Sequence, residues 1–328
     1  MAKKKAAKKQ PTTRRTRKAT KKKAATKKKR AATRRKDGTP DVIATSMNDV
    51  QAKKTAYEKT RERNRIVQAE KSRAGREIGP LPAPADPDRR EACRLNLKLF
   101  CETYFPLLFF LGWSMAHLKV IERIEQAVLE GGQFALAMPR GSGKTTLSLV
   151  AVIWAVVYGH RRFSVLVGAT QPRAVKMMKI IKRLFENTRS VFAEDFPEVV
   201  LPCAELEGRA NRATGQLCNN ERTNIGWNSD TVVLPTIQNS QCSGSVIGTA
   251  GLLGNIRGML EIDADGNLIR PDFVILDDPQ TKASAKSAEE TKTRLEMIDQ
   301  DVLGLAGPDE TLSVVMPCTV IEPDDLAA

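Results

Sequence analysis

The sequence predicts an α/β fold in which a mainly parallel sheet is covered by helices on both faces, preceded by a disordered basic tail. Two observations predict the fold: short apolar runs alternate with longer segments of helical periodicity, and these runs are apolar throughout, as in strands buried on both faces. A third observation predicts the tail, because residues 1–40 contain no Val, Ile, Leu, Phe, Tyr or Trp. Such a segment buries too little apolar surface to offset its ordering entropy.

The tail also holds most of the charge. Residues 1–40 contain 19 of the 53 basic residues but only one of the 38 acidic residues, Asp37. The tail therefore carries +18, whereas the remaining 288 residues carry −3. A polyanion such as double-stranded DNA is the expected partner, bound with salt-sensitive affinity through counterion release. A solubilising or nuclear-import-like tail is the alternative, and a mitochondrial transit peptide is excluded because it needs an apolar helical face.

The chain is expected to have three parts. After the tail, residues 41–87 form a charged helical linker that ends in the Pro-rich stretch "GPLPAPADP". Residues 88–328 form the folded domain, and Asp86-Pro87-Asp88 can cap its first helix.

Within that domain the elements follow in order. A helix over 115–132 has apolar positions at helical spacing and closes on two glycines. Residues 200–250 are less regular, with strand-like runs at 231–237 and 245–250. The other expected strands are 134–138, 163–170, 272–279 and 311–319, and the other helices are the apolar run around 147–158, the striped segment 171–187 and the capped segment 287–307.

Cysteine usage and hydropathy limit the class of protein. The six cysteines form no C-x-x-C pair and only two histidines occur, so neither a disulfide framework nor a zinc site is expected. The longest apolar run, about 12 residues, is too short for a membrane span. We expect a protein of the cytoplasm that is neither secreted nor bound to a membrane.

The stretch "AMPRGSGKTT" (137–146) follows one expected strand and opens a helix. It matches the end of the phosphate-loop pattern G-x-x-x-x-G-K-[ST], but Met138 stands at the first glycine position. Backbone N–H groups of Gly141, Ser142 and Gly143 can face phosphate oxygens at a helix N-terminus. Lys144 would bridge the outer phosphates and Thr145 would hold Mg²⁺. The predicted nucleotide-binding set is Arg140, Gly141, Ser142, Gly143, Lys144, Thr145 and Thr146.

Two acids at the end of a later strand complete the chemistry. In "VILDDP" (274–279) we assign Asp277 to Mg²⁺ and Asp278 to orienting the attacking water. Thr319, after the strand ending "MPC", is a candidate for sensing the terminal phosphate and coupling it to motion. Arg140 and Arg257 are candidates for stabilising transition-state charge, Arg257 as an arginine finger. The predicted catalytic set is Asp278, Arg140 and Lys144.

These motifs together resemble the ATPase domain of the large terminase subunit, the DNA-packaging motor of tailed phages and herpesviruses. "PRGSGKTT" resembles the family's deviant phosphate loop with an arginine, "VILDDPQT" its acidic strand motif, "MPCTVI" its coupling motif, and "GNIRG" a glycine-arginine segment between them. The resemblance covers residues 100–328. It implies a P-loop NTPase of the RecA/ASCE-like kind that hydrolyses ATP to ADP and phosphate with Mg²⁺.

The resemblance also implies a setting. Terminase motors translocate double-stranded DNA into a procapsid as a homo-oligomeric ring on the portal protein, with a small terminase subunit, in the cytoplasm of an infected bacterium. The family continues into an RNase H-like nuclease domain, but this sequence ends at Ala328, soon after the coupling motif. We therefore expect no nuclease activity from this chain and interpret it as a fragment, a split gene product or a truncated reading frame.

Two other functions remain open from the sequence. A helicase-like DNA-dependent ATPase also pairs a phosphate loop with an acidic strand, although it needs a second lobe with an arginine finger. A DNA-tethering or DNA-condensing protein would act through the basic tail alone.

Overall fold

The computed structural model describes residues 58–70, 76–254, 256–307 and 311–327. The predicted tail 1–40 lies outside these residues. Residues 58–70 form a helix whose residues are all exposed. The chain divides into two compact units, Met1–Arg65 and Ile66–Ala328, and the second is described below. No helix within the described ranges is long and apolar enough to cross a membrane.

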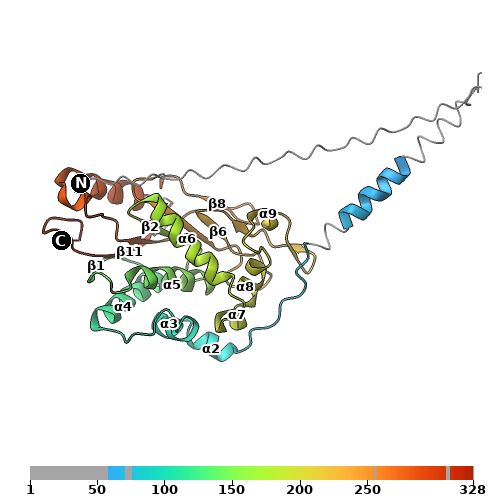
Figure 1. Cartoon of the computed structure of the whole chain (residues 1–328), viewed down its shortest axis with the longest axis horizontal. Coiled ribbons are helices and arrows are strands. Elements are labelled where there is room, and N and C mark those ends of the chain that lie inside the picture. Colours follow the sequence, from blue (N-terminus) through green and yellow to red (C-terminus); the bar gives the residue numbers. More distant parts are fainter. Residues whose placement is uncertain (1–57, 71–75, 255, 308–310, 328) are drawn as a thin grey trace, which may run out of the picture. The chain divides into compact units, whose positions relative to one another are not determined.

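A seven-stranded sheet forms the centre of the second unit (Figure 1). Its strand order is β1-β11-β10-β2-β7-β6-β5; the first five strands are parallel, and β6 and β5 continue the sheet in antiparallel pairing. The strands are β1 (Gln133–Ala137), β2 (Phe163–Gly168), β5 (Gly226–Trp227), β6 (Thr231–Val233), β7 (Val246–Gly251), β10 (Phe273–Asp277) and β11 (Ser313–Cys318). The predicted mainly parallel sheet is confirmed.

Apolar cores on both faces of the sheet explain the uninterrupted apolar strands. Along β2, Leu166 packs into one core, and its neighbours Val165 and Val167 pack into the other. The larger core receives side chains from the helices that lie between residues 97 and 213. The smaller core receives Val302 and Leu305 from the C-terminal part of the chain. The residues of β2, β7 and β10 are therefore buried whichever way they point, whereas β1 at the edge of the sheet is partly exposed.

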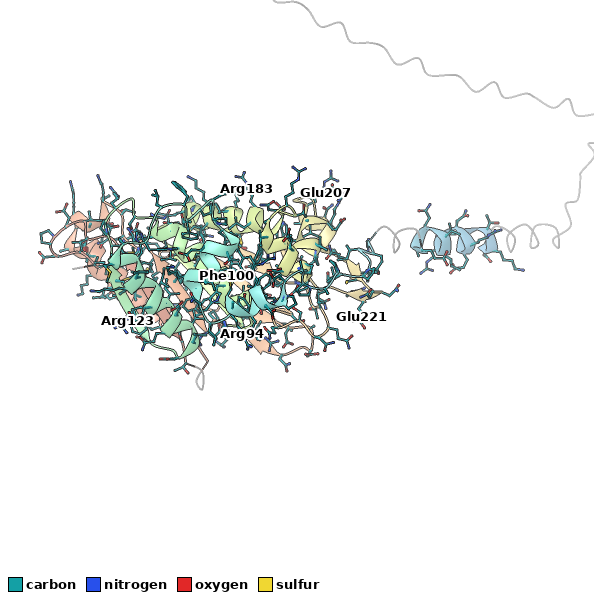
Figure 2. All side chains as sticks on the ribbon, turned by 90° about the horizontal axis from the view of Figure 1, so that it is seen from below. Arg94, Phe100, Arg123, Arg183, Glu207 and Glu221 are labelled. Carbon is teal, nitrogen blue, oxygen red and sulfur yellow. The ribbon has the colours of Figure 1, made fainter. Side chains whose placement is uncertain are left out.

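The unit also contains helices and a short helical turn. They are α2 (Pro87–Ala92), α3 (Leu97–Tyr104), α4 (Met115–Leu129), α5 (Lys144–Val157), α6 (Gln171–Phe185), α7 (Val191–Asp195), α8 (Pro197–Ala204), α9 (Ala210–Ala213), the 3₁₀ turn Ser284–Lys286 and α10 (Ala288–Met297). Phe100 of α3 is fully buried among aromatic rings, whereas the charged side chains of Arg183, Glu207 and Glu221 are exposed (Figure 2).

The segment before the sheet is attached by one buried acid. Asp195, fully buried at the end of α7, accepts hydrogen bonds from Arg89 Nε and Nη2, both at 2.7 Å, and from the Tyr104 hydroxyl at 2.8 Å. Asp86 caps α2 as predicted, because its side chain accepts from the Arg89 amide at 2.9 Å. Contacts to the unit begin earlier than residue 88, since the Ile78 amide donates to Leu217 O at 2.9 Å.

Two differences from the predicted elements concern local geometry. The helix expected over 287–307 is capped by Ser287 but leaves α geometry at Met297 and continues as a π-helix, Ile298–Val302, which directs Val302 into the smaller core. The sequence also shows no strands where two hairpins form. These are β3 (Leu217–Cys218) with β4 (Glu221–Arg222), and β8 (Glu261–Ile262) with β9 (Leu268–Ile269).

Candidate functional site

Strand order brings the predicted residues to one edge of the sheet. Strand β11 lies between β1 and β10 and is parallel to both, so the carboxyl ends of all three meet. The Met138 amide donates to Cys318 O at 2.8 Å, and the Asp278 amide donates to Pro317 O at 3.3 Å. We call this place the loop edge: it comprises the glycine loop (138–145), Asp277, Asp278 and Thr319.

The glycine loop owes its shape to two residues with positive φ. Gly141 has φ 77° and Gly143 has φ 84°, a region that favours glycine. Gly143 is the N-cap of α5, so Lys144 begins that helix. Met138 does not have a positive φ, and its side chain is buried in the larger core. The backbone at that position therefore does not require the glycine of the usual pattern.

Lys144 and Asp278 meet on either side of Thr319. Lys144 is 5% exposed, and its Nζ donates to Thr319 Oγ1 at 2.6 Å and to Pro139 O at 3.2 Å. Thr319 Oγ1 in turn donates to Asp278 Oδ1 at 3.0 Å, and Lys144 Nζ lies 3.7 Å from that oxygen. One hydroxyl thus links the loop lysine to the strand-end acid.

Asp277 is a buried carboxylate in which one oxygen has hydrogen-bond partners and the other has none among the described residues. The Thr145 hydroxyl donates to Asp277 Oδ2 at 2.8 Å, whereas Oδ1 has no hydrogen-bond partner among the described residues. Burial raises the pKa of Asp277 above its ordinary value, although Thr145 and Arg173 act in the opposite direction. Its neighbour Asp278 adopts φ 44°, which few residues other than glycine do.

Arg173 also contacts Asp277, and the sequence did not lead us to predict it as a site residue. Arg173 lies in the first turn of α6, which follows β2, the other neighbour of β10. Its Nη2 lies 3.0 Å from Asp277 Oδ2, 3.4 Å from Thr145 Oγ1 and 3.5 Å from Asp278 Oδ2. One weak signal was present in the sequence, because a cation in the first turn of a helix opposes the helix dipole.

His117 is a second residue that the sequence did not indicate. Its Nε2 lies 2.6 Å from the carbonyl oxygen of Ser142, and its Nδ1 lies 2.7 Å from Ser114 Oγ, the cap of α4. Because the carbonyl can only accept, Nε2 carries a proton, and Nδ1 accepts from the Ser114 amide at 3.2 Å. His117 therefore fixes the glycine loop against α4.

A pocket of about 210 Å³ adjoins the glycine loop on the side of α4. Its walls include Phe109, Trp113 and His117, together with 141–143 and Thr146 of the loop and α5. Phe109 and Trp113 are stacked with their ring centroids 5.2 Å apart. The arrangement combines flat aromatic surfaces with backbone N–H groups of the loop.

Not every predicted residue joins the network of the loop edge. Arg140 is exposed, and the buried Ser142 hydroxyl has no hydrogen-bond partner among the described residues. Arg257 lies in the segment after β7, and its exposed guanidinium pairs with Asp301 of the π-helix. The structure brings together Lys144, Thr145, Asp277, Asp278 and Thr319.

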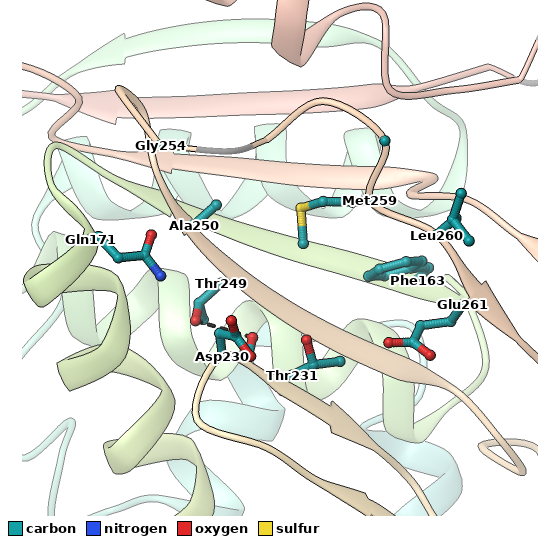
Figure 3. Close-up of a pocket in the computed structure, with 11 residues that line it drawn as sticks. Phe163, Gln171, Asp230, Thr231, Thr249, Ala250, Gly254, Met259, Leu260 and Glu261 are labelled. Atoms are coloured by element: carbon teal, nitrogen blue, oxygen red, sulfur yellow. Dashed lines mark hydrogen bonds between the residues drawn. The ribbon is translucent and has the colours of Figure 1, made fainter.

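A second pocket, of about 490 Å³, lies over β7 (Figure 3). Phe163, Thr249 and Met259 are among its walls, and the Thr249 hydroxyl donates to Asp230 O at 3.2 Å. Gln171 also lines it and accepts a hydrogen bond from the Gly251 amide at 2.8 Å. No residue of the loop edge lines this pocket.

Neither protein-family models nor curated proteins give a match to this chain. Its function is therefore inferred from the chemistry of the loop edge.

Proposed function

We propose that this chain is a Mg²⁺-dependent ATPase, and that it is the motor part of a large terminase subunit that packages double-stranded DNA. One observation carries the ATPase proposal: Lys144 and Thr145 of the glycine loop meet Asp278 and Asp277 directly, through contacts of 3.7 Å and 2.8 Å. A phosphate loop followed by paired carboxylates at a neighbouring strand end is the arrangement that nucleotide hydrolysis needs.

The strand order supports the RecA/ASCE-like assignment. One strand, β11, separates the strand that precedes the glycine loop from the strand that ends in the acids. This order places Thr319 between Lys144 and Asp278. A hydroxyl there suits the predicted role of sensing the terminal phosphate.

The residues present fit a magnesium ion. Thr145 Oγ1 and Asp277 Oδ2 lie 2.8 Å apart, and adjacent ligands of an octahedral Mg²⁺ are separated by about 3 Å. The unpartnered Asp277 Oδ1 also indicates a carboxylate held ready for a cation. Mg²⁺ commonly takes one or two carboxylates and completes its shell with phosphates and water. When bound, it would neutralise charge on the phosphates.

Asp278 is the proposed residue that orients the attacking water. Its side chain is 24% exposed, so water reaches it, whereas Asp277 is fully enclosed. Its backbone adopts the left-handed conformation, and its carboxylate faces Lys144 and Thr319. Lys144 would hold the outer phosphates, and the aromatic pocket beside the loop has the surfaces to take the base.

Arg140 and Arg257 both remain candidates for stabilising transition-state charge. Arg140 is exposed within the glycine loop, which suits an arginine that turns toward bound phosphate. Arg257 would first have to leave Asp301. The packaging role itself depends on the resemblance of the motifs, and the DNA partner on the charge of residues 1–40.

The ATPase proposal is tested with Lys144→Ala. Loss of the phosphate-bridging cation should lower ATP turnover by about 100-fold or more. Turnover is followed as phosphate release with Mg²⁺, with and without double-stranded DNA, and the circular dichroism spectrum verifies the fold. A folded variant that turns over ATP at the wild-type rate would refute the proposal.

A further inference from the structure

Arg173 occupies the position where a divalent cation would lie. A single nitrogen, Nη2, contacts Asp277 Oδ2 and Thr145 Oγ1, the two atoms proposed above as metal ligands. The same nitrogen lies 3.5 Å from Asp278. A guanidinium and a divalent cation on these same oxygens would repel each other at a separation of a few ångströms.

The charges of the site are already balanced without a metal. Asp277 and Asp278 face two cations, Lys144 and Arg173. A free divalent cation would add two uncompensated positive charges to this group. A nucleotide brings the negative phosphates that compensate them and offer the displaced guanidinium a new partner.

The side chain of Arg173 is the part able to move. The start of α6 packs closely against β7. A Cβ on Gly251 would clash with the Gln171 amide nitrogen, and the Gln171 side chain accepts a hydrogen bond from the Gly251 amide. The Arg173 side chain, by contrast, is 37% exposed, and among the described residues it is bound to the site through Nη2 alone. Rotation of the side chain can release Asp277 while the helix stays in place.

We propose that Arg173 is a placeholder for the metal. In the nucleotide-free protein it neutralises Asp277 and excludes free divalent cations. When metal and nucleotide bind together, its side chain moves away from Asp277. The inference depends on the proposed ATPase function. Arg173 thereby makes metal binding conditional on nucleotide, which is a positive coupling between two ligands.

The test measures Mn²⁺ binding by electron paramagnetic resonance of the free ion, with and without a non-hydrolysable ATP analogue. Arg173→Gln should tighten Mn²⁺ binding by about tenfold in the nucleotide-free protein, the usual scale of such couplings. With the analogue present, wild type and variant should differ much less. Arg173→Lys retains the charge and should keep nucleotide-free binding weak.

Lys176→Gln is the matched control, because it removes one exposed cation from the same helix outside the site. It should leave Mn²⁺ affinity within about twofold, as expected for a screened surface charge. Unchanged or weaker nucleotide-free binding in folded Arg173→Gln would overturn the placeholder role alone. Failure of wild type to bind Mn²⁺ with the analogue would instead overturn the proposed function.

Discussion

Asp195 and Asp277 are both fully buried carboxylates, but they differ in their hydrogen-bond partners. Asp195 accepts from Arg89 through both oxygens, from Tyr104 and from the Asp86 amide. Asp277 has one oxygen without a partner. Burial disfavours both charges, but the donors outweigh it at Asp195 and hold its pKa below the ordinary value, whereas the pKa of Asp277 is raised. Asp195, whose oxygens all have donors, stabilises the fold, whereas Asp277 has an oxygen that is available for a ligand.

Asp195→Asn should therefore destabilise the protein. At neutral pH the loss should be about 2 kcal/mol, the scale of hydrogen bonds to a charged group. Because the folded pKa is lowered, the contribution of Asp195 is complete above the ordinary aspartate pKa and is lost as the pH falls through the lowered value. The difference in unfolding free energy, measured with urea at several pH values, should shrink toward acid.

Asp88→Asn provides the control for that measurement. Asp88 is exposed on the same segment, and its replacement should change the free energy of unfolding by less than about 0.5 kcal/mol. Equal stabilities of wild type and Asp195→Asn at neutral pH would show that the Arg89 pair contributes nothing.

At the scale of elements, the long parallel strands were predictable and their order was not. Buried parallel strands are apolar throughout, so β2, β10 and β11 are evident from composition alone. The loop, the acids and Thr319 were placed at strand ends for the same reason. The sequence contained a weak signal for Arg173 and none for His117, because their contacts depend on α6 and α4 packing beside strands distant in sequence.

The hairpin β8–β9 was missed despite a local signal. Asp265-Gly266, with φ 85° at the glycine, is a turn pair that favours a hairpin. Its strands are only two residues each and bring little apolar pattern. The parallel sheet, by contrast, followed from the hydrophobic pattern.

The position of β11 between β1 and β10 leads to a prediction about Thr319. Thr319→Val preserves the shape of the strand end but removes the hydroxyl between Lys144 and Asp278. We expect ATP turnover to fall by about tenfold or more, since hydrogen bonds to charged groups contribute about 1.5–3 kcal/mol. Binding of a fluorescent ATP analogue should change less. Thr319→Ser should restore turnover, and full activity of the valine variant would exclude a role for the hydroxyl.

At the scale of the whole chain, the excess positive charge and the proposed ATPase residues lie in different parts of the sequence. Residues 1–40 carry +18 and none of the proposed ATPase residues, while the rest of the chain carries −3. The six cysteines, which are all described, are free and buried, so no disulfide contributes to the unit. Affinity for a polyanion and hydrolysis of ATP are therefore expected to be separable by truncation.

Deletion of residues 1–40 should weaken binding to double-stranded DNA while basal ATP turnover persists. Binding of the full chain, followed by fluorescence anisotropy on a labelled duplex, should fall steeply between about 50 and 200 mM salt, because each neutralised phosphate releases condensed counterions. The truncated chain should show a much smaller salt slope. A tethering protein would keep no activity after the deletion, and a motor would keep its ATPase. Salt-independent binding by the full chain would contradict the electrostatic role of the tail.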